Sequence, residues 1–248
     1  MRFIQLTETA STNNDARELA RSGEFFRGGG ETIWLRADRQ TAGRGRHGRD
    51  WVSETGNLFC TGLFLRRDSL AQAPRFGFVA AIAVYDTLKH FAPEANISLK
   101  WPNDVLVSGA KTSGLLLETG TDHGQDWMMV GIGINITSHP DDTPYPATHL
   151  AAHLHGKHTP SPEFMLSILS GHMDHWHEIY VRQGFDSIRE AWSARAHIAG
   201  EKISARLSEN DHINGEFVGL GANGELRLAL ADGTIRAVFA ADVTFGAR

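Results

Sequence analysis

The stretch Gly43-Arg44-Gly45-Arg46-His47-Gly48-Arg49 is the most informative part of this 248-residue chain for both fold and function. Glycine lets the backbone bend and approach a ligand closely. Each arginine guanidinium offers planar donors that match phosphate and carboxylate oxygens. We therefore expect a loop that becomes ordered around an anion. An exposed Arg/Gly loop that contacts nothing is the alternative, and the stretch alone leaves the two about level.

The stretch also matches the dinucleotide-binding pattern Gly43-x-Gly45-x-x-Gly48. That site requires the glycines to follow a strand directly and to open a helix. Here residues 50–57 are typical of a turn, and Leu58–Leu65 is typical of a strand. We reject the dinucleotide interpretation and predict a loop that follows a strand at Thr32–Ala37.

Composition indicates an ordinary globular protein, with 41% hydrophobic and 21% charged residues. The net charge of -5 and the pI of about 6.2 argue against bulk attraction to nucleic acid or to an anionic membrane. No apolar run reaches the ~18 residues that a membrane span needs, and Met1–Glu8 lacks the apolar region of a signal peptide. The single cysteine, Cys60, excludes an internal disulfide, favours the cytoplasm and is expected in the core rather than as a nucleophile.

Hydrophobic periodicity and helix-end signals divide the first 198 residues into helices and short strands. A helix should begin near Ser11, with Thr12 and Asp15 in capping-box spacing, and end at Gly23. The five prolines between Ser138 and Pro162 predict a long loop. Further helices are expected at 74–91, 162–182 and 185–196, and strands at 3–6, 97–99, 105–107, 115–119 and 127–136.

The pattern changes after about Ala199, where apolar and polar residues alternate over 202–207, 213–220, 225–231 and 234–239. Asn223-Gly224 and Asp232-Gly233 are strong two-residue hairpin signals. These features predict a small all-β unit that docks on the main body.

Two strand ends carry polar groups suited to an anionic ligand. In Ser98–Val105, alternation places Lys100 opposite Leu99, and Asn103 and Asp104 follow after Pro102. A cation, an amide and a carboxylate in one bend suit a nucleoside triphosphate with Mg²⁺, although a surface Lys–Asp turn is slightly favoured by this segment alone. Lys111 is a second cation at the start of a strand, and it could equally be an ordinary turn lysine.

The segment Gly131-Ile132-Gly133-Ile134-Asn135-Ile136 is expected to place its isoleucines in the core. Its two glycines then share the opposite face with Asn135. Glycine weakens a strand, so two on one face suggest that something lies flat against it. A ligand ring and a closely packed helix fit about equally, and Asn135 tips the interpretation toward a ligand.

Together, these segments resemble the biotin–protein ligases in motif, order and spacing, over about 11–245. The motifs that carry the resemblance are 40–51, Lys100-Trp101-Pro102-Asn103-Asp104, Lys111-x-x-Gly114 and Gly131-x-Gly133-x-Asn135. Thr112-Ser113 departs from the family pattern, which we expect to alter strand packing rather than chemistry. The resemblance implies a catalytic domain over 1–198, an α+β unit with a mixed sheet flanked by helices and related to class II aminoacyl-tRNA synthetases. It also implies an SH3-like β-barrel over 199–248.

The resemblance further implies ATP-dependent conversion of biotin to biotinyl-5′-AMP, followed by transfer to one lysine of a biotin carboxyl carrier domain. The implied catalytic residues are Arg46, Lys100 and Lys111. Biotin would be bound by Ser11, Thr12, Asn13, Gln40, Arg44, Gly45, Arg46, Lys111, Gly114, Gly131 and Gly133, with Lys111 at the carboxylate. ATP and the adenylate would be bound by Arg46, Arg49, Trp51, Lys100, Asn103, Asp104, Asn135 and Trp192, with the last two at adenine and Asp104 at Mg²⁺.

Three other functions remain open at this stage. A lipoate or octanoyl ligase would share the fold, but that group lacks the Gly-Arg-Gly-Arg-x-Gly loop. One basic loop on an acidic chain is a poor footprint for a nucleic-acid-binding protein. A histidine-based metal protein is suggested by two histidine groups, but no cysteine or carboxylate set completes a site: His172, His175 and His177; and His149, His153, His155 and His158.

Only ten residues precede Ser11, and 3–6 already reads as a strand. A helix-turn-helix domain of the kind found in repressor-type ligases needs more chain than that. We therefore expect a monofunctional ligase without operator binding. Family members occur as monomers and dimers, so the resemblance allows a homodimer.

Overall fold

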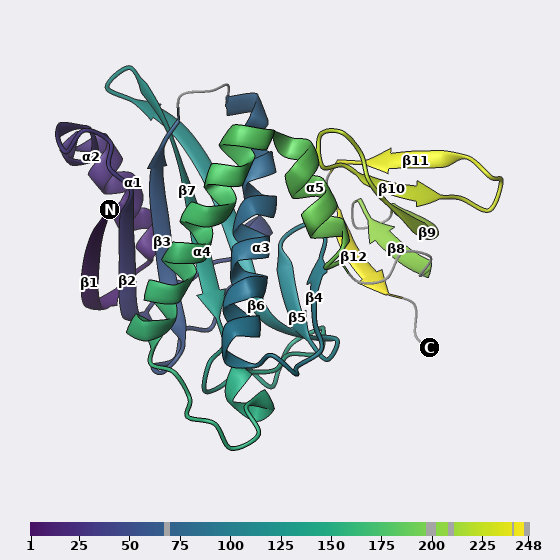
Figure 1. Ribbon diagram of the computed structural model, residues 1–248, viewed down its shortest axis with the longest axis horizontal. Coiled ribbons are helices and arrows are strands. Elements are labelled where there is room, and N and C mark those ends of the chain that lie inside the picture. The colour runs from purple at the N-terminus through teal and green to yellow at the C-terminus, as the bar shows by residue number, and fades with distance from the viewer. Residues whose placement is uncertain (67–69, 197–201, 208–210, 240, 246–248) are drawn as a thin grey trace.

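The computed structural model describes residues 1–66, 70–196, 202–207, 211–239 and 241–245, which contain two β-sheets (Figure 1). The larger sheet has seven strands in the order β1-β2-β3-β7-β6-β5-β4. β1 runs parallel to β2, and every other neighbouring pair is antiparallel, which makes the sheet mixed as predicted. Its strands are β1 Arg2–Thr9, β2 Ile33–Gln40, β3 Leu58–Leu65, β4 Ile97–Lys100, β5 Asp104–Val107, β6 Ala110–Asp122 and β7 Gln125–Ile134.

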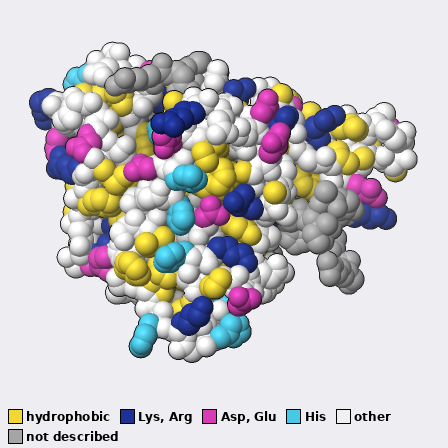
Figure 2. All heavy atoms as spheres, viewed as in Figure 1, with side chains coloured by type: hydrophobic (Ala, Val, Ile, Leu, Met, Phe, Trp, Pro, Cys, Tyr) yellow, Lys and Arg dark blue, Asp and Glu magenta, His cyan; other side chains and the backbone are white. Residues whose placement is uncertain are grey.

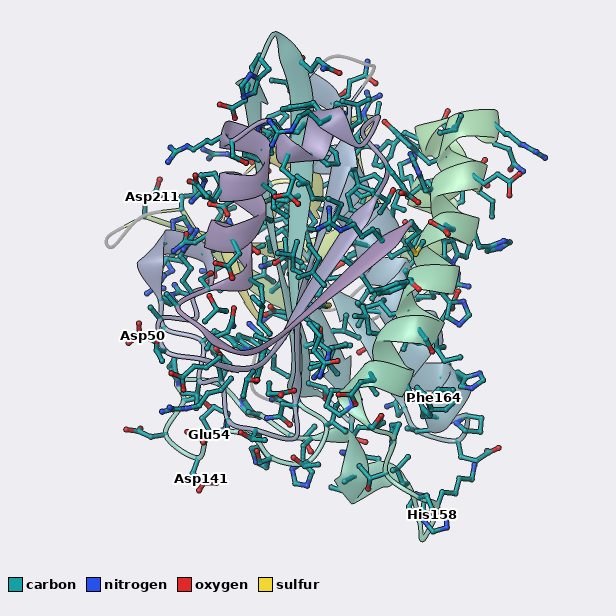
Figure 3. The ribbon with its side chains drawn as sticks, turned by 90° about the vertical axis from the view of Figure 1, so that its left-hand side faces the viewer. Asp50, Glu54, Asp141, His158, Phe164 and Asp211 are labelled. Atoms are coloured by element: carbon teal, nitrogen blue, oxygen red, sulfur yellow. The ribbon has the colours of Figure 1, made fainter. Side chains whose placement is uncertain are left out.

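Helices cover both faces of this sheet. Figure 3 shows the first helices and the long helix that carries Phe164 on opposite sides of the strands. Alternation along β2 explains how one strand serves both layers, because Trp34 belongs to one core cluster while Ile33 and Leu35 belong to the other. The helices are α1 Thr12–Arg21, α2 Glu24–Arg27, α3 Ala73–Phe91, α4 Pro162–Gln183 and α5 Phe185–Ser193.

The smaller sheet has five antiparallel strands in the order β11-β10-β9-β8-β12. Along β10, Leu226 and Leu228 are buried while Arg227 is exposed, as the alternation predicted. The strands are β8 Lys202–Arg206, β9 His212–Leu220, β10 Leu226–Ala229, β11 Ile235–Val238 and β12 Asp242–Phe245.

The small unit packs against the large one through the turn between β9 and β10. The indole Nε1 of Trp101 donates to the carbonyl oxygen of Gly224 at 3.0 Å. A Cβ on Gly224 would lie 2.5 Å from the ring of Phe78 on α3. Arg75 Nη2 also donates to Asn223 Oδ1 at 2.8 Å. The small unit is therefore docked next to the β4–β5 turn, which contains the Lys-Trp-Pro-Asn-Asp motif.

Most of the predicted elements are confirmed, with the following differences. The helix from Ser11 forms, but the Thr12–Asp15 capping box does not, and the side chain of the N-cap residue Ser11 makes no capping hydrogen bond. Strand β6 is much longer than the predicted 115–119, and α2 and β12 were not predicted. The hairpin signals at Gly224 and Gly233 are confirmed with positive φ, but the connections at 221–225 and 230–234 exceed two residues. The predicted loop from Ser138 contains a short 3₁₀ turn at Leu150–His153.

The predicted domain boundary at 198/199 lies outside the described residues. Among the described residues, no helix is both long enough and apolar enough to cross a membrane.

Candidate active site

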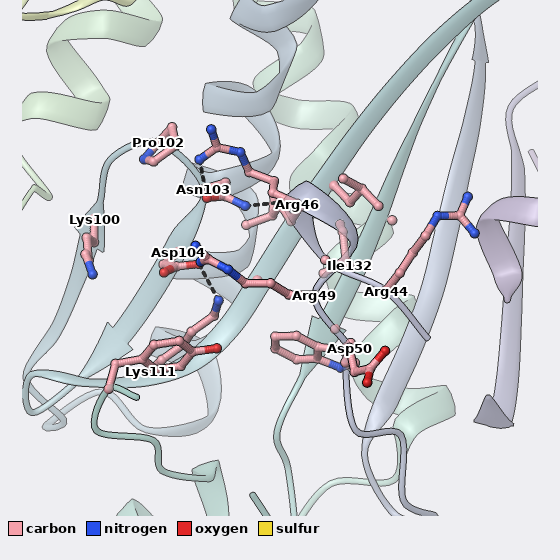
Figure 4. Close-up of a pocket in the computed structure, with 18 of the residues that line it drawn as sticks. Arg44, Arg46, Arg49, Asp50, Lys100, Pro102, Asn103, Asp104, Lys111 and Ile132 are labelled. Atoms are coloured by element: carbon pink, nitrogen blue, oxygen red, sulfur yellow. Dashed lines mark hydrogen bonds and ion pairs between the residues drawn. The ribbon is translucent and has the colours of Figure 1, made fainter. Parts of the chain in front are cut away.

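A cavity of about 500 Å³ opens on the α1 side of the large sheet. Its walls come from the start of α1, the Arg/Gly loop, the β4–β5 turn, strands β6 and β7, and the small sheet (Figure 4). Figure 4 places Lys100 and Arg44 on opposite sides of this space, with Arg46, Arg49 and Lys111 between them. Segments far apart in sequence thus bring these five cationic side chains to one cavity, and Arg206 of the small sheet lines it as well.

The cavity gathers nearly all of the predicted site residues. Asn135 and Trp192 do not line it. The predicted residues that do line it are Ser11, Thr12, Asn13, Gln40, Arg44, Gly45, Arg46, Arg49, Trp51, Lys100, Asn103, Asp104, Lys111, Gly114, Gly131 and Gly133.

Gln40, at the end of β2, organises the start of α1. Its Oε1 accepts hydrogen bonds from the Thr12 backbone N–H at 2.9 Å and the Thr12 hydroxyl at 3.2 Å. Its Nε2 donates to Ser53 Oγ at 3.1 Å. The first N–H groups of a helix have no partner within the helix. Gln40, at the end of β2, therefore provides the capping acceptor that the sequence analysis had expected from the Thr12–Asp15 capping box.

Asn13 is held on both sides of its amide. The hydroxyl of Thr61 lies 2.6 Å from Asn13 Oδ1, and Asn13 Nδ2 donates to Glu118 Oε2 at 2.7 Å. The amide lies so close to β7 that a Cβ on Gly131 would come within 2.2 Å of Asn13 Oδ1. Gly131 is therefore required for the approach of Asn13 to the sheet.

Trp51 packs closely against the second glycine of β7, Gly133. A Cβ on Gly133 would lie 2.4 Å from the indole, and one on Gly114 of the neighbouring β6 would lie 2.9 Å from it. The bare strand face expected from Gly131 and Gly133 is thus filled by two protein side chains, Asn13 and Trp51, which themselves line the cavity. No Cβ at these positions is compatible with this packing.

Lys111 occupies a mixed ionic and aromatic environment. Its Nζ lies 2.7 Å from Asp104 Oδ1, as marked in Figure 4. The same ammonium lies 5.3 Å from the ring centroid of Trp51 and 5.1 Å from that of Tyr145. Both members of the ion pair are largely buried, with side-chain exposures of 15% and 17%. A cation held inside a cavity in this way can meet a ligand carboxylate or phosphate.

Asn103 fixes the Arg/Gly loop against the β4–β5 turn. Its Nδ2 donates to the carbonyl oxygen of Leu115 at 2.7 Å, which leaves its Oδ1 facing Arg46. Arg46 Nη1 donates to that oxygen at 3.5 Å. The loop itself contains a 3₁₀ turn at Arg46–Gly48 rather than the start of a helix. This geometry agrees with rejecting the dinucleotide interpretation.

The two residues predicted to contact adenine, Trp192 and Asn135, do not line the cavity. Trp192 is 1% exposed and packs edge-on against Phe78 in the core, at a centroid distance of 5.6 Å. Asn135 is 3% exposed, and its Nδ2 donates to the Thr148 carbonyl oxygen at 3.1 Å. Asn135 thereby anchors the 138–149 loop. The sequence alone could not show whether the side-chain amide of Asn135 binds a ligand or a neighbouring loop.

Several lining residues were missed by the sequence analysis. Tyr145 lay in a segment that the prolines marked as loop, and nothing local indicated that this loop returns to Lys111. Glu118 of β6 was missed too: it does not line the cavity, but its carboxylate contacts Asn13, Arg17 and Arg44 beside it. The small sheet also lines the cavity, with Ser204, Arg206, His212 and Val243.

Cys60 also lines the cavity, although it is 1% exposed. Burial raises the pKa of its thiol well above the usual range, with Arg36 acting in the opposite direction. The thiol therefore stays protonated near neutral pH, in agreement with the prediction of a core residue.

The histidine-based metal site finds no support in the described part of the chain, where no group of three or more His, Cys, Asp or Glu side chains could hold a metal ion. Two loop histidines do meet, with 2.7 Å between His139 Nδ1 and His149 Nδ1. Figure 2 shows cationic, anionic, histidine and hydrophobic side chains interspersed over one face, without a continuous basic patch.

Comparisons with known proteins identify the family of this chain. Residues 25–135 match the Biotin/lipoate A/B protein ligase family, and residues 198–246 match the Biotin protein ligase C terminal domain. The chain is 37% identical to a biotin–[acetyl-CoA-carboxylase] ligase of Paracoccus denitrificans, over 97% of this chain and 99% of that protein. It is 32% identical to the bifunctional ligase/repressor BirA of Bacillus subtilis (strain 168), over 96% of this chain and 72% of that one.

Among solved structures, the biotin protein ligase from Aquifex aeolicus in complex with biotin and ATP has a TM-score of 0.79 and 25% identity, covering 99% of both chains. A biotin protein ligase from Leishmania major in complex with biotinyl-5-AMP has a TM-score of 0.67 and 24% identity, covering 96% and 99%, and supports the fold. On these grounds, this chain belongs to the biotin–protein ligases and is an enzyme of the ligase class.

Proposed function

We propose that this enzyme joins the carboxylate of biotin to ATP and then passes the biotinyl group to a lysine of a biotin carboxyl carrier domain, as in acetyl-CoA carboxylase. The observation that carries the proposal is one cavity that combines hydroxyl and amide groups at the start of α1 with the cations Arg46, Lys100 and Lys111. The hydroxyl and amide groups suit the ureido ring of biotin, and the cations suit its carboxylate and the phosphates.

The first step brings two anions together. A biotin carboxylate oxygen bonds to the α-phosphorus of ATP, and the bond to pyrophosphate breaks with the electron pair leaving on pyrophosphate. Lys111, Arg46 and Lys100 reduce the repulsion between the anions and stabilise the charge that builds on the phosphate. The 2.7 Å contact between the Lys111 ammonium and the Asp104 carboxylate supports a role for Lys111 at a ligand carboxylate.

A divalent cation fits the same end of the cavity. Mg²⁺ is usually bound by one or two carboxylates together with substrate phosphates and water, and Asp104 provides a carboxylate on the cavity wall. Asp104 would hold the ion, which would supply charge neutralisation on the phosphates. The remaining chemistry rests on the chain's own cations.

The second step requires that the acyl-adenylate survive until the acceptor amine arrives. An acyl-adenylate is hydrolysed by water, so a loop that covers it protects it. Arg44, Gly45 and Arg46 line the cavity and are tied to α1, β6 and the β4–β5 turn by side-chain hydrogen bonds. The lysine amine then bonds to the acyl carbon, AMP leaves, and the amine loses a proton.

Three further parts of the proposal concern setting and partners. We place the enzyme in the cytoplasm, where the single cysteine stays reduced. The expected partners are biotin and a carrier domain, without nucleic acid or membrane. A homodimer is compatible with the family resemblance, and light scattering of the purified protein measures it.

The experiment is biotin-dependent exchange of labelled pyrophosphate into ATP, followed by transfer of biotin to a purified carrier domain. Lipoate and octanoate serve as competing acids in parallel reactions. We expect exchange with biotin and Mg²⁺, and labelling of the carrier only when its acceptor lysine is present. Exchange with lipoate or octanoate but not with biotin would assign the enzyme to the other branch of the superfamily.

A further inference from the structure

Tyr145 is an aromatic residue of the active-site cavity that lies outside the motifs of the family resemblance. It belongs to the long loop between β7 and α4, and its ring centroid lies 5.1 Å from the ammonium of Lys111. Trp51, from the Arg/Gly loop region, lies 5.3 Å from the same ammonium. A cation within about 6 Å of an aromatic centroid is attracted by the negative face of the ring. Lys111 is therefore in contact with two rings and with the carboxylate of Asp104.

The loop that carries Tyr145 is tied directly to Lys111 by its backbone. The Lys111 N–H donates to the Pro146 carbonyl oxygen at 2.8 Å, and the Thr148 N–H donates to the Lys111 carbonyl oxygen at 3.0 Å. The Thr143 hydroxyl donates to the Tyr145 carbonyl oxygen at 2.6 Å. These bonds fix the loop on both sides of Tyr145, so the position of the ring is set relative to the lysine that it contacts.

Tyr145 also lines two hollows, as does its neighbour Pro144. It lines the active-site cavity and a smaller hollow of about 370 Å³, which is lined by eight residues of the same loop between His139 and Ala147. The half-buried side chain is thus shared by the two hollows and lies outside the buried core.

We propose that Tyr145 is a positioning residue, which with Trp51 forms an aromatic box that holds the ammonium of Lys111 in place for the anionic acyl substrate. The carboxylate of Asp104 is the other partner of that ammonium, and it is also the group placed to hold a divalent cation. When Asp104 turns to a cation, the two rings keep Lys111 at the cavity. This role rests on the proposed function, because the anion that Lys111 meets is the biotin carboxylate.

The test compares Tyr145→Phe with Tyr145→Leu. Phenylalanine keeps the ring without the hydroxyl, whereas leucine keeps apolar bulk without a ring. The dissociation constant of biotin is measured by calorimetry in the presence of Mg²⁺, alongside the dissociation constant of ATP. We expect Tyr145→Leu to weaken biotin binding by about threefold to fivefold, the size of one cation–π contact at a partly exposed site. Tyr145→Phe should bind biotin like the wild type, and ATP binding should change less than biotin binding in both.

The same Tyr145 substitution in a Lys111→Gln protein distinguishes positioning of the ammonium from a purely structural role of Tyr145. In Lys111→Gln the ammonium is absent, so adding Tyr145→Leu should cause no further loss of biotin affinity. A loss of the same size in both backgrounds would show that Tyr145 acts through packing alone and would overturn the proposal. Equal biotin affinity of Tyr145→Leu and the wild type would overturn it as well.

The proposed function can fail separately. If the wild-type protein neither binds biotin nor exchanges pyrophosphate in its presence, the assigned substrate is wrong and the role of Tyr145 toward it is refuted too. If the wild type does both and Tyr145→Leu is unchanged, only the role of Tyr145 is refuted.

Discussion

Arg44 and Glu118 form an ion pair that joins the Arg/Gly loop to strand β6, with 3.4 Å between Arg44 Nη2 and Glu118 Oε2. The same carboxylate accepts a hydrogen bond from Asn13 and pairs with Arg17 Nη2 at 2.7 Å. Arg44 also donates to Asn14 Oδ1 at 2.8 Å. Glu118 thus connects the loop, the first turns of α1 and the amide of Asn13 on the cavity wall. Closure of the loop and orientation of Asn13 depend on one side chain.

Glu118→Gln should loosen the Arg/Gly loop. Partly exposed ion pairs contribute about 0.2–1 kcal/mol each, so losing the charge should raise the population of the open loop about twofold to fivefold. Trypsin cleaves after arginine, and the rate of cleavage at Arg44, Arg46 and Arg49 measures that population. Glu178→Gln on α4, which removes the partner of Arg182, is the matched control. Equal cleavage rates in both variants would contradict the role assigned to Glu118.

Lys111→Ala should damage biotin binding and adenylation more than ATP binding. It removes the cation that faces the reacting carboxylate, so both substrate affinity and the stability of the transition state should fall. Pyrophosphate exchange over a range of biotin concentrations measures the first two quantities, and calorimetry measures ATP affinity. Full exchange activity at limiting biotin in the variant would refute the assignment.

The strands around the site show most clearly which parts of the fold the sequence predicts. The bounds of β3 match the predicted strand, because its apolar run is closed by turn residues on one side. Both ends of β6 were missed, and at its start Lys111 and Gly114, which line the cavity, interrupt the apolar pattern of a strand. The apolar pattern that predicts a strand is interrupted where the residues of the strand line a site, so the strand is missed there.

The limits of prediction in the site have a related cause. Motif spacing identified the cations and glycines, since their chemistry follows from residue type. The partner of each side chain depends on distant segments: Asn135 binds Thr148, and Lys111 contacts Tyr145. Trp192 was assigned to adenine by resemblance, yet its apolar bulk is used in the core. Such pairings follow from tertiary packing and have no local signature.

Gly133→Ala should disrupt the site because the added Cβ would lie 2.4 Å from the Trp51 indole. Overpacking of this kind costs about 1–3 kcal/mol, and the indole can move only by leaving Lys111 and the sheet. We expect lower stability in urea unfolding and at least a tenfold loss of pyrophosphate exchange. Gly171→Ala on α4 is the control, since nothing lies within 4 Å of its Cβ and alanine in a helix should stabilise by about 0.5–1 kcal/mol. Wild-type exchange by Gly133→Ala would show that Trp51 is not held as described.

The 138–149 loop should lose stability as the pH falls below the usual histidine range. Burial lowers the pKa of His149, as do the nearby His139 and His153. The unfolded chain then binds the proton first, at about pH 6.5, so stability is present above that pH and is lost as the pH falls toward the lowered pKa. The midpoint of thermal unfolding between pH 7.5 and 5.5 should fall more steeply in the wild type than in His149→Gln. The exposed His158→Gln is the control, and parallel slopes for all three proteins would contradict the prediction.

Arg46→Gly should let the acyl-adenylate escape. Arg46 lines the cavity and reaches Asn103 from the Arg/Gly loop, so it can hold the loop and the anionic intermediate at once. Losing a charge-assisted hydrogen bond typically costs about 1.5–3 kcal/mol, which corresponds to a release of biotinyl-5′-AMP faster by about tenfold to a hundredfold. A single-turnover experiment with labelled biotin, followed by rapid gel filtration, measures the fraction that stays bound. Labelling of bystander proteins by the escaped intermediate gives a second readout, which should rise as retention falls. Arg39→Gly removes an arginine paired with Glu8 on the neighbouring strand and should retain the intermediate like the wild type. Unchanged retention in Arg46→Gly would show that the intermediate is held by the rest of the cavity.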